Sequence, residues 1–456
     1  MKALSLIEIA DAVDGEINNK VELTIDSIST DTRQLESGDL FIALIGENFD
    51  AHDFLEQAFA KGAKAAVVSA DKDYSIDQPL IKVEDTTRAL QDLAAYYLQQ
   101  FSLPVIAVTG STGKTTTKDL IASVVGQKYK TLKTQGNFNN EIGLPLTLFR
   151  LDESYEAVVL EMGMRGLGEI DQLTEIAPPD IGVVTNVGKT HIELLGSIDN
   201  IAQAKSELVQ SLDSTGVAIL NADDQRVKNM AQLTTADIIY YGIEAKADLK
   251  GGNIKTLAQQ DQVFFELFGA GEKTEVILPM PGEYNVYNAL AAAAVGLELR
   301  LDLEQIQVGL SNASLTEKRN QILSTAAGIK IINDTYNANP TSVRAGLKTL
   351  SQISEQRKIA VLGDMLELGT VAEDEHYKLG AVVAAEGIDY LITIGDLAAE
   401  IARGAEDNGV DKSKIFTYNN KENLVVKLKN IMKADDTILV KASRGMKLEE
   451  IVESIS

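Results

Sequence analysis

The sequence contains no cysteine, and this single absence removes several kinds of chemistry. Without thiols the chain can form no disulfide, carries no thiolate nucleophile and offers no zinc-finger ligands. Histidine is also scarce, with only His52, His191 and His376 present. The lack of cysteine fits a reducing compartment, so we expect a cytoplasmic protein.

Positive charge is outnumbered, because 42 Lys and Arg stand against 67 Asp and Glu and leave a net charge of -25. Such a surplus repels phosphate backbones and anionic membranes, so nucleic acid is not an expected partner. No stretch approaches the roughly 18 consecutive apolar residues of a membrane span. Glu8 and Asp11 interrupt the short apolar stretch near Met1, which is untypical of a secretory signal.

The length of 456 residues predicts about three domains, and we place the boundaries near residues 100 and 313. The first domain, 1–100, reads as a small α/β unit followed by a connecting amphipathic helix through Leu90 and Leu98. Its predicted strands are 40–45, 65–69 and 80–83.

From residue 105 the pattern becomes strand–helix–strand, because fully apolar runs alternate with helical segments. The runs of this central domain, 101–313, are 105–108, 157–160, 181–184 and 217–220. Each ends in polar or glycine residues, and the carboxyl ends of parallel strands meet in one ligand crevice. The third domain, 314–456, repeats the pattern at 359–362, 391–394 and 438–440. We therefore predict an α/β protein with a parallel-sheet ATPase domain followed by a Rossmann-like, doubly wound domain.

A phosphate-binding loop follows the first central strand. It reads Thr109-Gly110-Ser111-Thr112-Gly113-Lys114-Thr115-Thr116, and a helical pattern comes next. Glycines let backbone N–H groups face an anion at the helix start, Lys114 reaches the β- and γ-phosphates, and the hydroxyl of Thr115 or Thr116 can bind Mg²⁺. The spacing is shorter than the standard G-x-x-x-x-G-K-[ST] motif, since the first glycine is Gly110. The competing interpretation is a glycine turn followed by a surface lysine.

Two further residues stand at strand ends. Glu161 directly follows its buried strand, which makes it a candidate magnesium ligand, although it could instead cap the helix after Gly168. His191 lies in the polar segment after the strand 181–184, where the crevice is expected, and its position alone does not separate a structural histidine from a functional one.

Other residues carry weak signals when taken singly. Helix periodicity assigns Lys205, in a predicted helix 200–212, no role beyond that of a solvated lysine beside Glu207. The remaining single signals are Asn285, Asn288, Arg319 and Asp334.

Taken together, the motifs resemble those of the Mur ligases, ATP-dependent amide-forming enzymes of peptidoglycan synthesis, over essentially the whole chain. Beside the phosphate loop, the supporting stretches are 31–33, 38–41, 46–54, 137–143, 161–163, 191–193, 282–289, 334–340, 362–369 and 443–445. Two positions depart from the family pattern, which commonly has His at Tyr284 and Ser at Thr32.

The resemblance implies roles residue by residue. Lys114, Glu161, His191, Lys205 and Arg319 would be catalytic, with Lys205 carbamylated. ATP would be held by residues 109–116, with Asn285 and Asn288 near the adenine, Asp334 at the ribose and Arg319 near the γ-phosphate. Mg²⁺ would be held by Thr115 or Thr116, Glu161, His191 and Lys205. Substrate would be bound by Asp31, Thr32, Arg33, Asn137, Asn337, Asp364, Ser443 and Arg444.

The implied reaction joins D-Ala-D-Ala to UDP-N-acetylmuramoyl-tripeptide through an acyl phosphate, in a protein expected to be monomeric. The first domain would bind the UDP end and the third the incoming dipeptide. Because Arg319 lies across a predicted domain boundary from Lys114, we expect ATP to close the third domain onto the second. Alternatives are a sibling Mur ligase or a folylpolyglutamate synthase using another amino acid, or a nucleotide-binding protein that is not a ligase.

Overall fold

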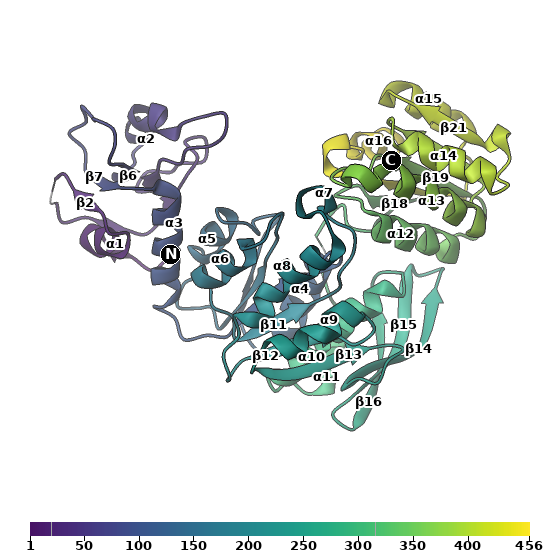
Figure 1. Cartoon of the computed structure of the whole chain (residues 1–456), viewed down its shortest axis with the longest axis horizontal. Helices are drawn as coiled ribbons and strands as arrows, with labels where there is room; N and C mark the ends of the chain where they lie inside the picture. Colours follow the sequence, from purple (N-terminus) through teal and green to yellow (C-terminus); the bar gives the residue numbers. More distant parts are fainter. Residues whose placement is uncertain (20, 315) are drawn as a thin grey trace. The chain divides into compact units, whose positions relative to one another are not determined.

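The computed structural model describes residues 1–19, 21–314 and 316–456, and the chain forms two compact units (Figure 1). The first unit comprises Met1–Ala107, Tyr129–Met164 and Gly168–Asp180, and the second comprises Val108–Lys128, Arg165–Leu167 and Ile181–Ser456. No helix in the described part of the chain is long and apolar enough to cross a bilayer.

The first unit contains a five-stranded sheet in the order β2-β7-β6-β5-β4, in which β4 to β7 are parallel and β2 is antiparallel. Its strands are β2 (Glu16–Ile17), β4 (Ile28–Ser29), β5 (Leu40–Ile42), β6 (Ala65–Ser69) and β7 (Leu80–Val83). β1 (Leu4–Ser5) and β3 (Thr24–Ile25) form a separate antiparallel pair. The strands predicted at 65–69 and 80–83 are confirmed, whereas the one predicted at 40–45 is too long. It ends at Ile42 because the chain reverses through Gly46, whose N–H donates to the Phe49 carbonyl.

Helices of the first unit are α1 (Leu6–Ala12), α2 (Leu55–Ala60), α3 (Thr86–Leu98), α5 (Gly143–Leu148) and α6 (Glu169–Ile176). α3 is the predicted connecting helix, and its apolar face is buried through Leu90 and Leu93. The buried Tyr97 hydroxyl donates to the Leu151 carbonyl at 2.6 Å, which fastens α3 to the segment ahead of β10 (Ala157–Glu161). β10 pairs in parallel with β9 (Thr131–Lys133).

β8 (Val105–Thr109) begins in the first unit and ends in the second. In the second unit it is followed outward by β11 (Ile181–Val184), β12 (Val217–Asn221), β13 (Asp237–Gly242) and β14 (Leu249–Leu257), all parallel. β15 (Gln262–Gly269) and β16 (Glu272–Leu278) then extend the sheet in the antiparallel sense. The strands β8, β11 and β12 are predicted from the sequence, whereas β13, β14 and the antiparallel β15 and β16 are not.

Helices of this part of the second unit are α4 (Lys114–Val125), α7 (Ile192–Leu195), α8 (Ile198–Gln210), α9 (Gln225–Asn229), α10 (Tyr284–Glu298) and α11 (Leu303–Ser311). α11 approaches α4 so closely that a Cβ on Gly309 would lie 2.6 Å from Val124 Cα. α8 begins two residues before the predicted helix, because Ser197 caps it by accepting from the Asn200 N–H.

The C-terminal sheet of the second unit has the order β17-β18-β22-β19-β20-β21, and only β17 is antiparallel. Its strands are β17 (Gln321–Ser324), β18 (Lys330–Asp334), β19 (Lys358–Gly363), β20 (Tyr390–Ile394), β21 (Ile415–Tyr418) and β22 (Thr437–Lys441). Its helices are α12 (Pro340–Ile353), α13 (Ala372–Ala385), α14 (Ala398–Asp407), α15 (Lys421–Ile431) and α16 (Glu449–Ile455).

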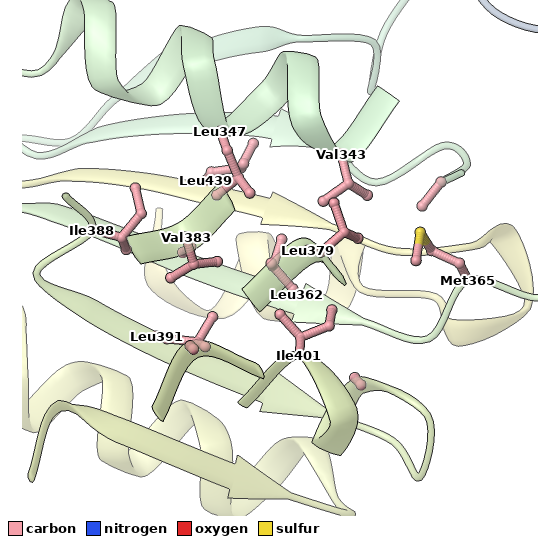
Figure 2. Close-up of a cluster of buried hydrophobic side chains, with 14 of the residues drawn as sticks. Val343, Leu347, Leu362, Met365, Leu379, Val383, Ile388, Leu391, Ile401 and Leu439 are labelled. Atoms are coloured by element: carbon pink, nitrogen blue, oxygen red, sulfur yellow. The ribbon is translucent and has the colours of Figure 1, made fainter. Parts of the chain in front are cut away.

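Two separate apolar cores lie on the faces of this sheet. On one face α12, α13 and α14 contribute Leu347, Leu379 and Ile401 (Figure 2). On the other face α15 and α16 contribute Leu424 and Ile451. A sheet covered by helices on both faces confirms the predicted doubly wound class.

Candidate functional site

The phosphate loop begins where β8 ends and passes into α4. Gly110 and Gly113 have φ angles of 150° and 83°, which L side chains rarely adopt. Space also requires glycine, because a Cβ at Gly110 would lie 1.8 Å from Thr185 Oγ1. Lys114 Nζ donates to the Gly110 carbonyl at 2.8 Å, so the lysine folds back over its own loop.

The loop is held by Asn186, which follows β11. Ser111 N–H donates to the Asn186 carbonyl at 2.9 Å, and Thr112 N–H donates to Asn186 Oδ1 at the same distance. These two amides therefore face Asn186 here. Asn221 Nδ2 donates to the Thr185 carbonyl at 3.0 Å, so the ends of β8, β11 and β12 meet as predicted.

Glu161, in the first unit, is 2% exposed at the end of β10. Asn139 Nδ2 donates to its Oε1 at 2.8 Å. Its Oε2 is buried without a hydrogen-bond partner among the described residues, a costly state that a cation would relieve. The alternative role as a helix cap is wrong, because Gly168 is the N-cap of α6.

His191 occupies a left-handed position with φ 53° at the start of α7. Its Nδ1 lies 2.5 Å from Oε2 of Glu367, in the loop after β19. The hydrogen bond from His191 lowers the pKa of Glu367. One residue earlier, Thr190 Oγ1 is buried and has no hydrogen-bond partner within the described ranges.

Lys205 lies on α8 and is 2% exposed, so its interpretation as a solvated lysine is wrong. Burial lowers the pKa of Lys205 well below its usual value, and the positive charge of Lys114 lowers it further. Helix periodicity missed this burial because the neighbouring elements that cover α8 come from elsewhere in the chain.

Asn285 and Asn288 are buried on one face of α10, so they neither cap nor face solvent. Asn288 Oδ1 accepts from Thr117 Oγ1 at 3.1 Å, which connects α10 to the helix of the phosphate loop. Asn285 Nδ2 donates to the Pro281 carbonyl at 2.7 Å. Tyr284, where the family commonly has His, is half-buried, and its removal from solvent raises its pKa.

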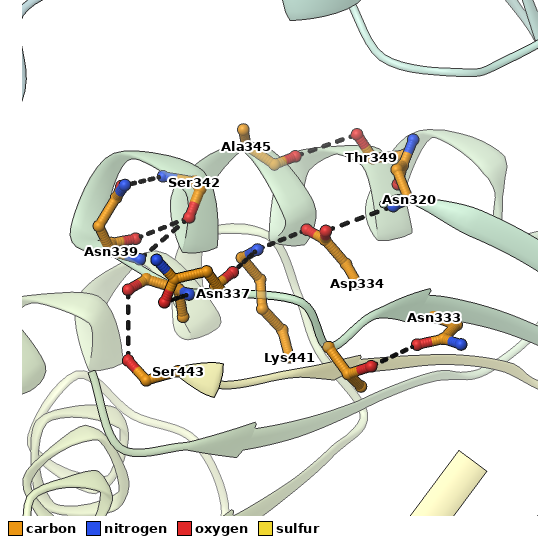
Figure 3. A network of polar contacts seen from close by, with 12 residues as sticks. Asn320, Asn333, Asp334, Asn337, Asn339, Ser342, Ala345, Thr349, Lys441 and Ser443 are labelled. Atoms are coloured by element: carbon orange, nitrogen blue, oxygen red, sulfur yellow. Dashed lines mark hydrogen bonds and ion pairs between the residues drawn. The ribbon is translucent and has the colours of Figure 1, made fainter. Parts of the chain in front are cut away.

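Asp334 ends β18 and accepts from two groups (Figure 3). The buried Lys441 Nζ forms an ion pair with Oδ2 at 2.5 Å, and the Asn320 N–H donates to Oδ1 at 3.3 Å. Burial lowers the pKa of Lys441, although the charge of Asp334 opposes this shift. Arg319 stacks on the Tyr336 ring, with Cζ 3.8 Å from the ring centroid.

The residues predicted to bind substrate fall into two groups. In the second unit, Lys441 Nζ donates to the Asn337 carbonyl at 2.9 Å, and the Ser443 N–H donates to the Asp364 carbonyl at 3.0 Å. Arg444 lies 5.6 Å from the Tyr336 ring centroid. These contacts bring Asn337, Asp364, Ser443 and Arg444 close to Arg319 and Asp334.

In the first unit, Arg33 pairs with Asp31 at 2.8 Å and lowers the pKa of that carboxyl. Thr32 Oγ1 donates to Gln57 at 3.4 Å. Asn137 is exposed in the loop that also carries Asn139.

Sequence reasoning missed several partners of these residues: Asn186, Asn320, Tyr336, Glu367 and Lys441. A lysine that directly follows an apolar strand, as Lys441 does, is a usable signal of a buried ion pair. Tyr336 and Glu367 lie inside motifs, whereas Asn186 and Asn320 do not, and the contacts of all four depend on residues distant in sequence.

The described residues contain no group of three or more His, Asp or Glu side chains arranged to hold a metal ion. Two single candidate metal ligands are nevertheless present: among the described residues, Glu161 Oε2 and Thr190 Oγ1 are buried and have no hydrogen-bond partner. Carboxylate and hydroxyl oxygens suit a hard cation such as Mg²⁺, and the nucleotide phosphates would supply the remaining ligands.

Three family models match the chain. They are the Mur ligase family catalytic domain at residues 24–98, the Mur ligase middle domain at 108–296 and the Mur ligase glutamate ligase domain at 318–444. Among curated relatives, the UDP-N-acetylmuramoyl-tripeptide--D-alanyl-D-alanine ligase of Bacillus subtilis is 41% identical, with 98% of this chain and 97% of the relative covered.

Solved structures give the same result. MurF from Acinetobacter baumannii superposes with a TM-score of 0.92 at 32% identity, covering 100% of this chain and 99% of that one. MurF ligase from Thermotoga maritima in complex with ADP gives 0.83 at 28% identity, covering 94% and 96%.

Proposed function

The chain belongs to the Mur ligase family, and from this premise we propose that it joins D-Ala-D-Ala to UDP-N-acetylmuramoyl-tripeptide. It is an ATP-dependent ligase that forms an amide bond and releases ADP and phosphate. The full-length match to relatives bearing that activity in their names carries the proposal, and the glycine-constrained phosphate loop supports it. The reaction serves peptidoglycan synthesis, and through it cell shape and division.

The chemistry requires activation of a carboxylate, because an amine does not displace oxide from it at neutral pH. A carboxylate oxygen attacks the γ-phosphorus of ATP, the bond from that phosphorus to the leaving oxygen of ADP breaks, and an acyl phosphate forms. The amine of D-Ala-D-Ala then attacks the carbonyl carbon, the bond to phosphate breaks, and the amine nitrogen loses a proton. Lys114 and Arg319 place positive charge against the transferring phosphoryl group.

Magnesium, when bound, neutralises triphosphate charge and polarises the γ-phosphoryl group. We assign its ligands to Glu161, His191 and the hydroxyl of Thr115 or Thr116, together with Lys205. The unpartnered Glu161 Oε2 supports this assignment. Since Glu367 contacts His191 Nδ1, the Nε2 atom is the nitrogen left to face a metal.

Lys205 is proposed to act as a carbamate. A neutral amine attacks the carbon of CO₂ and loses one proton, which gives R-NH-COO⁻. Burial and the charge of Lys114 favour the neutral amine, because both lower the pKa of Lys205. Carbamylation also replaces a like-charge contact with Lys114 by an attractive one and adds oxygen ligands for a metal.

The two ends of the substrate are assigned to separate parts of the chain. We propose that residues 1–100 bind the UDP end through Asp31, Thr32 and Arg33, and that Asn137 is a further substrate-binding residue. Residues 101–313 bind ATP, and residues 314–456 receive the dipeptide at Asn337, Asp364, Ser443 and Arg444. We further propose a monomer that works in the cytoplasm, where ATP is available.

Phosphate release from ATP and Mg²⁺ tests the function directly. UDP-N-acetylmuramoyl-tripeptide is supplied with D-Ala-D-Ala, with single D- or L-amino acids, or without an acceptor. We expect release that requires the dipeptide, and Lys114→Ala serves as the inactive control. Release with another amine would move the chain to a sibling activity, and release independent of an acceptor would indicate a nucleotide-binding protein that is not a ligase.

A further inference from the structure

Asn320 is a residue that neither the sequence motifs nor the proposed mechanism uses. It lies in the segment between α11 and β17, directly after Arg319. Asn320 has φ 49° and Lys318 has φ 62°, so left-handed residues stand on both sides of the arginine. Asn tolerates this conformation better than most residues, so Asn320 is suited to a tight turn at this position.

The contacts of Asn320 connect two residues that the family resemblance assigns to the nucleoside. Its Nδ2 donates at 3.3 Å to the Pro281 carbonyl, which also accepts from Asn285 Nδ2. Its backbone N–H donates to Asp334 Oδ1 at 3.3 Å (Figure 3). Asn320 therefore lies between Asn285, expected near adenine, and Asp334, expected at the ribose.

The side-chain oxygen of Asn320 is buried and has no hydrogen-bond partner among the described residues. Its orientation follows from the amide nitrogen, which is the atom able to donate to the Pro281 carbonyl. A buried acceptor left unpaired is unfavourable, so a donor is expected in the functional complex. The other groups that Asn320 contacts, the Pro281 carbonyl and the Asp334 carboxylate, are acceptors and supply none.

We propose that Asn320 Oδ1 accepts a hydrogen bond from the adenosine part of ATP, and that Asn320 is thereby a nucleotide-contacting residue of this ligase. The inference rests on the proposed function, since it takes ATP as the nucleotide. Adenosine offers two kinds of donor that suit this oxygen, the 6-amino group of the base and the hydroxyls of the ribose. The contact makes Asn320 a determinant of nucleotide selectivity.

Nucleotide analogues distinguish these donors. Affinities of the full chain are measured by calorimetry for ADP, inosine diphosphate, 2′-deoxy-ADP and 3′-deoxy-ADP. Inosine lacks the 6-amino group, and each deoxy compound lacks one hydroxyl. We expect wild type to bind ADP about tenfold or more tightly than the analogue that lacks the contacted group, because a buried acceptor then stays unpaired.

Two variants assign that discrimination to Asn320. Asn320→Gly tolerates the left-handed backbone. It should bind ADP no more tightly than the analogue that lacks the contacted group. Its affinities for the other two analogues, relative to ADP, should match those of wild type. Asn312→Ala, at an exposed position in the same connecting segment, is the matched control and should behave as wild type.

The possible outcomes separate this inference from the function itself. Equal affinity of wild type for all four nucleotides overturns the inference, as does full discrimination by Asn320→Gly. A purely structural role predicts that Asn320→Gly weakens all four nucleotides by one common factor, which also overturns it. Failure of wild type to bind ADP at all would instead count against the proposed function.

Discussion

Lys205 and Lys441 are both 2% exposed, and burial lowers the pKa of each. A buried ammonium is unfavourable unless a negative group pairs with it. Lys441 has such a partner in Asp334, which it fixes beside Asn320. Lys205 instead experiences the positive charge of Lys114, which lowers its pKa further. The first arrangement stabilises a cation, whereas the second favours a neutral amine, the form that the proposed carbamylation requires.

Carbamylation of Lys205 is tested with ¹³C-labelled bicarbonate. We expect a carbamate carbon resonance in wild type and in Lys228→Ala, which removes an exposed lysine of the same domain. The resonance should disappear in Lys205→Ala, and turnover should fall by about a hundredfold or more because metal ligands and local charge are lost. An unchanged resonance in Lys205→Ala would place the carbamate elsewhere.

His376 predicts a pH dependence of stability. Its ring is fully buried, Nδ1 contacts the Ala372 carbonyl at 2.7 Å, and Nε2 accepts from the Met365 N–H at 2.9 Å. Burial lowers the pKa of His376 below its usual value near 6.5, so the unfolded chain takes up this proton first. The stability from this residue is therefore present above about pH 6.5 and is lost as pH falls through the depressed folded pKa.

Urea unfolding of wild type and His376→Gln between pH 5 and 8 measures the contribution of His376 to the free energy of unfolding. The difference in unfolding free energy between the two should be flat above about pH 6.5. Below that pH it should change by up to about 1.4 kcal/mol per pH unit, the limit for one proton. Parallel curves throughout the range would show that His376 does not titrate between the folded and unfolded states.

At the scale of elements, the loop after β11 holds the phosphate loop. Asn186 accepts hydrogen bonds from two backbone amides of the phosphate loop, and Ser111 Oγ donates to the Gly188 carbonyl at 3.0 Å. The same loop continues to His191, which contacts Glu367 in the loop after β19. The loop after β11 therefore contacts both the phosphate loop after β8 and the loop after β19. All three loops lie at the carboxyl ends of parallel strands, where such sheets bind ligands.

Gly110→Ala tests how tightly β8 and β11 enclose the loop. The added Cβ would overlap Thr185 Oγ1 at a backbone angle that alanine avoids, so the loop must move. We expect ADP affinity to fall by about tenfold or more, with a lower melting temperature. Gly409→Ala is the control, because Gly409 has φ 93° but no atom within 4 Å of an added Cβ. It should lose about 1–2 kcal/mol of stability and keep ADP affinity.

At the scale of the whole molecule, a net charge of -25 opposes the binding of a triphosphate and a UDP substrate. The site must therefore concentrate cations locally. Within the second unit, Arg319 and Arg444 contact the same Tyr336 ring, and Lys189 pairs with the buried Glu375 at 2.7 Å. Arg319 and Arg444 therefore lie around one ring of the C-terminal part, and Lys189 connects the central part to the C-terminal part.

Arg319→Ala tests whether the C-terminal part completes the catalytic site. We expect turnover to fall by about a hundredfold or more, because the transferring phosphoryl group loses one neighbouring positive charge. The melting temperature should stay unchanged. Arg344→Ala, at an exposed position on α12, should behave as wild type. Small-angle scattering should show compaction by ATP in wild type that is reduced in Arg319→Ala. Unchanged turnover would make the predicted closure wrong.

The sequence by itself determined the α/β class, the position of the phosphate loop and part of the parallel strands, namely β5 to β8, β10 to β12, β19, β20 and β22. These features follow from local apolar runs and from glycines at fixed spacing, which constrain the backbone wherever the rest of the chain lies. The pattern failed at β13 to β16, where half-exposed strands carry a weaker signal than the fully apolar runs.

Only the tertiary structure decided which partner each site residue has. Glu367 meets His191 across 176 positions of sequence, and Lys441 meets Asp334 across 107. The burial of Lys205 and the unpaired oxygens of Glu161 and Asn320 likewise arise from elements packed around them. Local spacing carries no information about such contacts, because burial, pairing and the resulting pKa values are set by residues that folding brings together.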